Sequence, residues 1–218
     1  MSKDNSDIEY IRGLDNVSRA LEPTLRYTIA ATAMASANKP HLIVHLVSYC
    51  KEVLSEHQMV SFVAKARESL LKMISTIGAP RVINGTAALM DAIDDRIKDQ
   101  LPKQVQRSRD EYNYDDIHKR GLSLWNIVYS KQAEKLESKI GGWYPDLIEI
   151  IQTDLYGRLL SDCRILDAKS TELCTIGALV PIDVPFQLKS HVLGAGRLGA
   201  SPEDIGSARV LAQVIADH

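Results

Sequence analysis

Apolar residues recur at helical spacing along most of this chain, with polar residues between them. In a helix, residues three and four positions apart share a face, so this spacing is typical of amphipathic helices. Alternating strand patterns are few. The sequence therefore predicts an all-α protein. The predicted helices cover residues 8–21, 24–37, 41–54, 59–77, 81–97, 117–140, 143–160, 168–180 and 187–198, with a last helix from residue 201.

Proline, glycine and capping residues mark where these helices begin and end. Pro40 suits the first turn of a helix, and Gly78-Ala79-Pro80 ends the helix predicted over residues 59–77. Asp167 is a candidate N-cap. Ser201 followed by Pro202 has the N-cap and first-turn residues of a final helix. These signals predict a bundle of many short helices joined by tight breaks.

The most polar stretch of the chain divides it into two halves. It contains Pro102 and many charges, and it predicts a linker at residues 101–116 between an N-terminal helical half, 1–100, and a C-terminal half, 117–218. Residues 28–50 and 175–196 share an order: a helix of small residues, a break with proline, and a helix with an early histidine. This order indicates two related helical halves, although the match is loose enough to leave a single irregular bundle open.

Composition and charge exclude several classes of function. The net charge of −2 over 218 residues and the scattered aromatic residues argue against a nucleic-acid surface. No apolar run is long enough to cross a membrane. Three scattered cysteines and a polar, acidic start predict an intracellular protein, cytoplasmic by default with an organelle not excluded. The terminal Ala216-Asp217-His218 differs from the Ser-Lys-Leu peroxisomal signal.

Gly194, Gly196 and Gly199 have the spacing G-x-G-x-x-G of a dinucleotide-binding loop. That loop needs a buried strand before it and a parallel strand after its helix. The residues before Gly194 are no β-branched run, so the motif lacks this context. We expect Gly194 and Ala195 to allow close helix packing and Gly199 to end the helix.

A candidate acid–base site lies on either side of the break at residues 181–185. Gln187 and His191 are four residues apart and share a helix face, and Glu172 lies on the preceding helix. A carboxylate, an amide and an imidazole would then meet between two helices. Histidine exchanges protons near neutral pH, and a carboxylate can orient it. Val184 and Ala195 are candidate substrate-binding neighbours, so the sequence predicts Glu172 and His191 as the catalytic pair.

This motif resembles the carboxymuconolactone decarboxylase and alkyl hydroperoxidase D-like family. The resemblance rests on Glu172, His191 nineteen residues later, Ala195, Gly199 and the acidic turn Glu203-Asp204. Gly78-Ala79-Pro80 is similar to a segment of some members, and fungal members with a doubled arrangement are the most similar. The resemblance implies an alkyl hydroperoxidase D-like helical bundle that forms homo-oligomers. We also expect a homo-oligomer because residues 41–54 are largely apolar.

The chain departs from the peroxidase branch of that family at its two redox cysteines. Val184 and Gln187 stand there, and neither can form a thiolate. The resemblance therefore implies the decarboxylase branch: a lyase or acid–base enzyme without metal or organic cofactor, acting on a small organic acid or lactone. The alternative is a non-catalytic homo-oligomeric relative that binds a small molecule or has a structural role.

Each candidate residue also has a structural interpretation. His191 is compatible with a satisfied core histidine, Glu172 with a carboxylate near its helix N-terminus, and Gln187 with a helix surface. His41 and His45 have the four-residue spacing of metal ligands, but no carboxylate completes a set, so no metal is expected. The pairs Trp125 with Tyr129 and Trp143 with Tyr144 fit core or subunit-interface positions. These alternatives stay open from the sequence alone.

Overall fold

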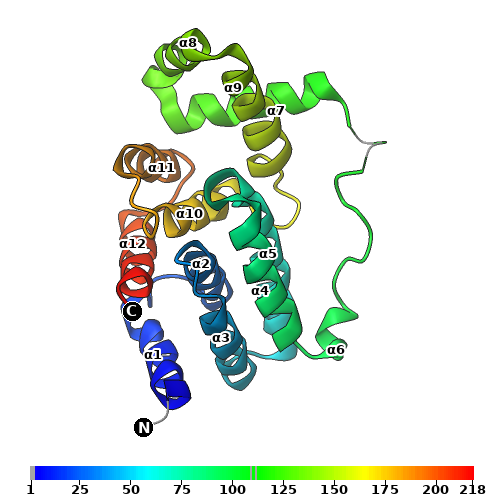
Figure 1. Ribbon diagram of the computed structural model, residues 1–218, viewed down its shortest axis with the longest axis vertical. Helices are drawn as coiled ribbons and strands as arrows, with labels where there is room; N and C mark the ends of the chain where they lie inside the picture. The colour runs from blue at the N-terminus through cyan, green and yellow to red at the C-terminus, as the bar shows by residue number, and fades with distance from the viewer. Residues whose placement is uncertain (1–2, 109, 111) are drawn as a thin grey trace.

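The computed structural model describes residues 3–108, 110 and 112–218, and every regular element within them is a helix. The all-α prediction is confirmed. Helices α2 (Pro23–Ser36) and α10 (Ala168–Leu179) lie at the centre of the molecule, and the other helices surround them (Figure 1).

Both central helices are buried on nearly all sides, which explains their composition. Ile29 of α2 faces Gly177 of α10, where a Cβ atom would come within 2.9 Å of the Ile29 side chain. The Oγ of Ser36 donates a hydrogen bond to the carbonyl of Ala178 at 2.5 Å. The hydroxyls of Thr28 and Thr32 donate to carbonyls one turn earlier in their own helix. Small side chains and internal hydrogen bonds therefore let two helices cross closely without leaving buried hydroxyls unpaired.

The remaining helices of the core lie on either side of this pair. In Figure 1, α1 and α12 stand on one side with both chain ends nearby, and α4 and α5 stand on the other. Their bounds are α1 Lys3–Val17, α3 Pro40–Val53, α4 Glu56–Lys72, α5 Ile74–Ala92, α6 Asp95–Lys98, α11 Pro185–Arg197 and α12 Pro202–Asp217. One helix boundary differs from the prediction. The helix that was expected to reach Ile77 ends at Lys72, and α5 begins at Ile74. Gly78, with φ 76°, therefore lies inside α5 and kinks it.

The predicted internal repeat has a counterpart in the backbone. Before α3, Asn38 is left-handed (φ 57°) and Lys39 has φ −118° and ψ 57°. Before α11, Asp183 is left-handed (φ 51°) and Val184 has φ −116° and ψ 75°. Each turn leads into a helix that begins at proline. The next helix after α3 and the next helix after α11 each begin with a serine capping box, at Ser55 for α4 and at Ser201 for α12.

A second group of helices sits above the core in Figure 1. It comprises α7 (Tyr114–Tyr129), the 3-10 turn η2 (Ser130–Gln132), α8 (Ala133–Trp143), α9 (Pro145–Ile150) and the π-helix η3 (Ile151–Leu160). The single helix predicted over residues 117–140 was wrong, because Ser130 adopts φ 49° and breaks it. Trp125 and Val128 are buried as expected, whereas Ile127 is 38% exposed because it lies on the outer face of α7.

The predicted linker follows α6 as irregular chain, and side chains tie it to both halves. Arg107 forms ion pairs with Glu68 of α4 and with Asp162, the latter at 3.2 Å, and all three side chains are buried or nearly so. Lys72 makes a second connection between the halves. Its fully buried ammonium donates to the carbonyls of Leu160 and Leu166 and to the Thr171 hydroxyl. Helices of both halves contribute to one continuous hydrophobic core.

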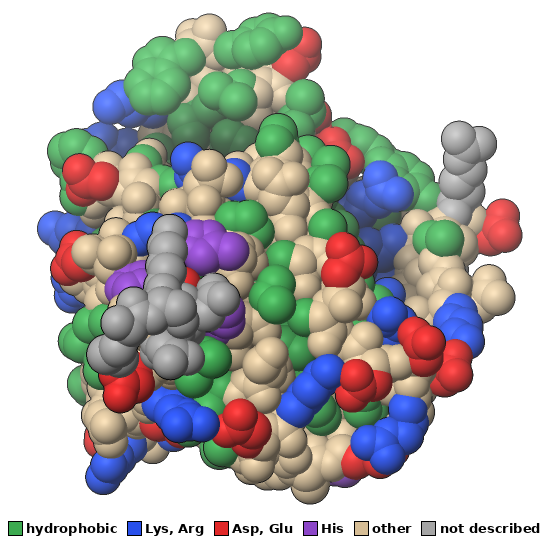
Figure 2. Space-filling model, turned by 60° about the horizontal axis from the view of Figure 1, so that its bottom comes forward, with side chains coloured by type: hydrophobic (Ala, Val, Ile, Leu, Met, Phe, Trp, Pro, Cys, Tyr) green, Lys and Arg blue, Asp and Glu red, His purple; other side chains and the backbone are tan. Residues whose placement is uncertain are grey.

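Most of the exposed apolar residues lie away from the helix expected to form an interface. In α3, Leu42, Ile43, Leu46, Val47 and Cys50 are buried within the chain itself, and Val44 and Val53 are exposed. That helix therefore gives little reason to expect an oligomer. Several large exposed side chains lie on or beside α8, α9 and α11, and hydrophobic side chains gather at the top of Figure 2. Those on or beside these three helices are Trp143, Tyr144, Leu147, Ile150, Phe186 and Leu193. No helix in the described part of the chain is long and apolar enough to span a membrane.

Helices α7 and η3 pack so closely that they require glycine. A Cβ atom at Gly121 would lie 1.9 Å from the carbonyl oxygen of Gln152. We expect Gly121→Ala to lower the free energy of unfolding by about 3 kcal/mol through overpacking. Gly206→Ala in α12 is the matched control: its Cβ would meet nothing within 4 Å, so that variant should keep or slightly raise stability. Urea unfolding measures both, and equal stabilities would contradict this close contact.

Candidate functional site

The structure brings Glu172 and His191 into direct contact between α10 and α11. Glu172 belongs to the central helix α10 and is fully buried, and His191 lies in the middle of α11 with 6% exposure. Asp167 caps α10 by accepting a hydrogen bond from the amide of Ser170, which fixes where that helix begins. The turn at residues 180–184 then reverses the chain, so that two residues nineteen apart in sequence face each other.

One hydrogen bond defines the pair. His191 Nδ1 lies 2.8 Å from Glu172 Oε2, with the Nδ1–H donating to the carboxylate. A carboxylate at Nδ1 fixes the ring orientation and leaves the other ring nitrogen, Nε2, with its lone pair free. No residue in the described part of the chain hydrogen-bonds His191 Nε2. The pair therefore has the arrangement of an oriented general base.

The second carboxylate oxygen of Glu172 is the unusual feature of the site. Oε1 is buried and has no hydrogen-bond partner among the described residues. A buried carboxylate oxygen without a partner costs free energy, and native proteins keep few such groups. A structural glutamate at this position would be expected to have both oxygens satisfied. The orphaned oxygen thus favours a functional interpretation of Glu172 over a purely structural one.

Three aromatic side chains form one wall of the site. The Tyr129 ring meets the His191 ring edge to face, with centroids 6.4 Å apart. The Tyr156 hydroxyl donates to the Tyr129 hydroxyl at 3.0 Å, and Trp125 contacts both tyrosine rings. Burial, and to a lesser extent the Glu172 charge, raises the pKa of Tyr129. The two tyrosines therefore stay protonated beside the pair. Sequence reasoning placed Trp125 and Tyr129 at core or subunit-interface positions and did not include Tyr156 among the site residues.

Close helix packing explains why residue 194 of the glycine motif is a glycine. A Cβ atom there would lie 3.0 Å from Glu172 Oε2 and 3.1 Å from a methyl of Val128. Glycine therefore lets α11 approach both the carboxylate and α7. Gly199 has φ 92° and follows the end of α11, so it ends that helix as predicted. The motif lies within and just after a helix, and no strand precedes it among the described residues.

The other predicted site residues lie around the pair without bonding to it. Ala195 is fully buried in α11. Val184 is the partly buried residue that precedes α11. Gln187 lies one turn before His191 with an exposed side chain. Within the described residues no hydrogen bond joins Gln187 to Glu172 or His191. The structure thus brings two of the five predicted residues into direct contact.

The histidines that have the spacing of metal ligands do not meet at a common site. His45 Nε2 lies 3.8 Å from Asp7, and His218 Nε2 lies 3.4 Å from the same residue. His41 is exposed on the first turn of α3. Across residues 3–108, 110 and 112–218, no group of three or more His, Cys, Asp or Glu side chains is placed to hold a metal ion.

The three cysteines are free, and two of them are inaccessible. Cys50 and Cys174 are buried, and burial raises the pKa of Cys174 to about 11. The thiolate is the form that attacks peroxide, so neither residue is suited to redox catalysis. We expect purified protein not to reduce cumene hydroperoxide with dithiothreitol above the rate without protein. Ellman's reagent should label only Cys163, which is exposed. Robust turnover that Cys174→Ser abolishes would contradict this prediction.

Comparison with known proteins relates the chain to two yeast proteins. No family model matches it, and no solved structure matches it significantly. The Schizosaccharomyces pombe protein named Peroxisomal protein 2 is 30% identical over 203 residues, which cover 93% of this chain and 91% of that protein. The Saccharomyces cerevisiae protein of the same name is 31% identical over 172 residues, which cover 70% of this chain and 61% of that protein. The chain therefore belongs to the family of these yeast Peroxisomal protein 2 sequences.

Proposed function

We propose that this protein is a cofactor-free acid–base enzyme that acts on a small organic acid or lactone. The observation that carries the proposal is the buried Glu172–His191 pair with its 2.8 Å hydrogen bond and its unpartnered Glu172 oxygen. The resemblance to the carboxymuconolactone decarboxylase and alkyl hydroperoxidase D-like family supports it. Val184 and Gln187 at the positions of the redox cysteines favour the decarboxylase branch of that family over the peroxidase branch.

The geometry assigns a role to each member of the pair. His191 Nε2 takes a proton from the substrate or delivers one to it, and Glu172 stabilises the imidazolium that forms. In a decarboxylation, the bond between a carbon and its carboxylate breaks and CO₂ leaves. The electron pair stays on the carbon, which accepts a proton from Nε2 of the His191 imidazolium. His191 regains that proton from the substrate's carboxyl group or from solvent. The buried position of Glu172 strengthens its interaction with the imidazolium, because little water screens it.

One observation favours the alternative of a non-catalytic, ligand-binding relative. The described residues form three well-defined surface cavities among others, and neither Glu172 nor His191 lines any of these three. Substrate would have to reach His191 through the small part of its surface that stays exposed, beside α7 and α11. A protein whose role is binding would instead use a cavity elsewhere.

Proton exchange tests the enzyme proposal directly. We would incubate the protein in D₂O with a panel of β-oxo acids and γ-lactones that carry a carboxyl group. NMR then follows C–H exchange and CO₂ release. We expect His191→Gln and Glu172→Gln to lower the rate by about 10² to 10⁴, the usual contribution of an acid–base group. His57→Gln, at an exposed histidine of α4, is the matched control and should keep the full rate.

Two outcomes would reject the enzyme proposal. One is that no member of the panel exchanges or decarboxylates faster with protein than without it. The other is that His191→Gln reacts as fast as the unchanged protein while its circular dichroism spectrum is also unchanged. Either result would favour the binding alternative.

We further propose that the protein resides in peroxisomes. The support is the printed name of both yeast relatives. A fluorescent protein fused to the N-terminus of this chain should give punctate signal that coincides with a peroxisomal marker in fission yeast, and the fluorescent protein alone should stay diffuse. Diffuse signal from the fusion in cells with normal peroxisomes would contradict this assignment.

A further inference from the structure

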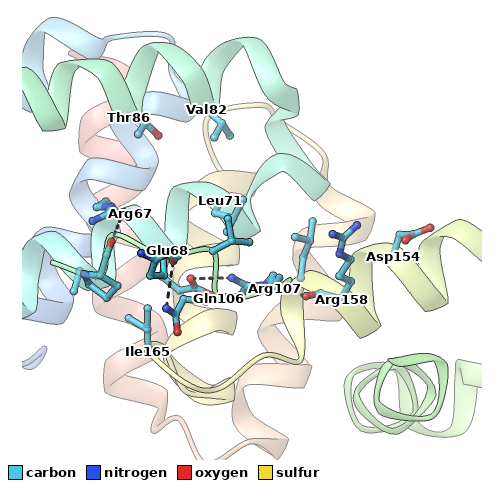
Figure 3. Close-up of a pocket in the computed structure, with 15 residues that line it drawn as sticks. Arg67, Glu68, Leu71, Val82, Thr86, Gln106, Arg107, Asp154, Arg158 and Ile165 are labelled. Atoms are coloured by element: carbon cyan, nitrogen blue, oxygen red, sulfur yellow. Dashed lines mark hydrogen bonds and ion pairs between the residues drawn. The ribbon is translucent and has the colours of Figure 1, made fainter. Parts of the chain in front are cut away.

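The largest of the three cavities lies between α4, α5, η3 and the irregular segment after α6 (Figure 3). Its volume is about 620 Å³. Binding sites for small organic molecules have volumes of about 300 to 1,000 Å³. The cavity is therefore large enough for a small-molecule ligand.

Much of the cavity wall is aliphatic. Leu71 comes from α4, Val82 from α5, and Leu159 and Ile165 from the end of η3 and the loop after it. Val105 of the irregular segment also lines the cavity and is 76% exposed. Among the described residues, no aromatic side chain lines it. An aliphatic wall without stacking platforms suits an alkyl chain better than a planar ring.

Two of the charged residues that line this cavity neutralise each other. Glu68 forms its ion pair with Arg107, and Arg107 also pairs with Asp162 at 3.2 Å. Asp162 in turn pairs with Arg164, and these arginines lower the pKa of Asp162 to about 2. Arg107 therefore holds the irregular segment in place, and its charge is already matched.

A second cavity adjoins the first and is rich in arginine. Its volume is about 380 Å³, and Arg107 and Arg158 line both cavities. Arg120 and Arg164 line the second cavity, with Asp162 as its acidic residue. Two of these four guanidinium groups, those of Arg107 and Arg164, already pair with carboxylates. The positive charge of the other two would attract an anion.

Two of these arginines have no carboxylate partner among the described residues. Arg120 donates to the Gly157 carbonyl at 3.0 Å and to the Ser161 hydroxyl at 3.3 Å. Arg158 lies over the Tyr112 ring at 5.4 Å. Neither contact neutralises the guanidinium charge. Arginine forks match the geometry of carboxylate and phosphate oxygens, so these two side chains are suited to hold an anionic head group.

We propose that the two adjoining cavities bind an amphipathic organic anion. Its aliphatic chain lies against Leu71, Val82 and Leu159, and its carboxylate or phosphate head group pairs with Arg158 and Arg120. This site goes beyond the proposed acid–base function, because it shares no residue with the Glu172–His191 pair. Its ligand is defined by an apolar chain of several carbons joined to one anionic group.

Isothermal titration calorimetry with simple amphiphiles tests the proposal. Dodecanoate and dodecyl phosphate, each kept below its micelle-forming concentration, are the probes, and the tighter of the two identifies the head group. Dodecyltrimethylammonium has the same chain with the opposite charge, and acetate and inorganic phosphate lack the chain. We expect at least one of the two anionic probes to bind, and we expect none of the three controls to bind.

Matched variants locate the ligand. Arg158→Gln and Arg120→Gln should each weaken binding about tenfold, the usual effect of losing one charge-assisted contact. Lys103→Gln removes an equal charge from the exposed irregular segment outside both cavities and should leave binding unchanged. Thr86 of α5 lines the first cavity, so the larger side chain of Thr86→Trp should occupy the space of the ligand. This variant should abolish binding while the melting temperature of the protein stays the same.

Several results would overturn the proposal that these cavities bind an amphipathic anion. They are the absence of binding by both anionic probes, equal binding of the cationic probe, or unchanged affinity in Arg158→Gln and Arg120→Gln. A larger loss in Arg67→Gln would place the head group at the opposite end of the first cavity and would also reject the proposed orientation. His191→Gln should bind the probes normally, so failure here is distinguishable from failure of the acid–base proposal.

Discussion

The close crossing of α2 and α10 is the constraint on which the rest of the structure depends. Each helix is surrounded by others, so every polar side chain on it needs an internal partner. Thr28 and Thr32 of α2 meet this need through backbone carbonyls, and Ser36 meets it through the carbonyl of Ala178. Glu172 is also on α10, and His191 is the partner of only one of its oxygens. The packing of the central helices therefore both buries the carboxylate and leaves part of it unsatisfied.

The second group of helices, α7 to η3, shapes the molecule around this centre. It supplies the aromatic wall beside His191, and α7 comes close to α11 because position 194 is glycine. The same group supplies Arg120 and Arg158, which border the two cavities away from the acid–base pair. Lys72 joins this group to α4 through the Leu160 and Leu166 carbonyls, and burial lowers the pKa of its ammonium. This group of helices thus contributes to two separate candidate sites.

The two sites make different physical demands on the chain. The acid–base pair requires exclusion of water and a fixed ring orientation, which the rigid contact between α10 and α11 provides. The adjoining cavities require an apolar chamber beside unneutralised arginines, and irregular chain held by Arg107 closes one side of it. A chain with small net charge can still concentrate positive charge at one place. Here Arg107 and Arg164 form ion pairs with their acidic neighbours, whereas Arg120 and Arg158 have no carboxylate partner among the described residues.

The sequence by itself determined the helical class, the helix starts at Asp167 and Ser201 and the end at Gly199. These follow from local rules: apolar spacing, capping hydrogen bonds and the backbone freedom of glycine. The sequence also predicted that Glu172 and His191 pair, and the turn at residues 180–184 brings them into contact. Tertiary structure alone decided the break at Ser130, the exposure of Ile127 and the contacts of Tyr156. It also decided how Arg107 crosses from the irregular segment to Glu68 and Asp162. Such contacts join residues far apart in the chain, and no local pattern encodes them, because their energy comes from packing and charge pairing that exist only once the helices are assembled.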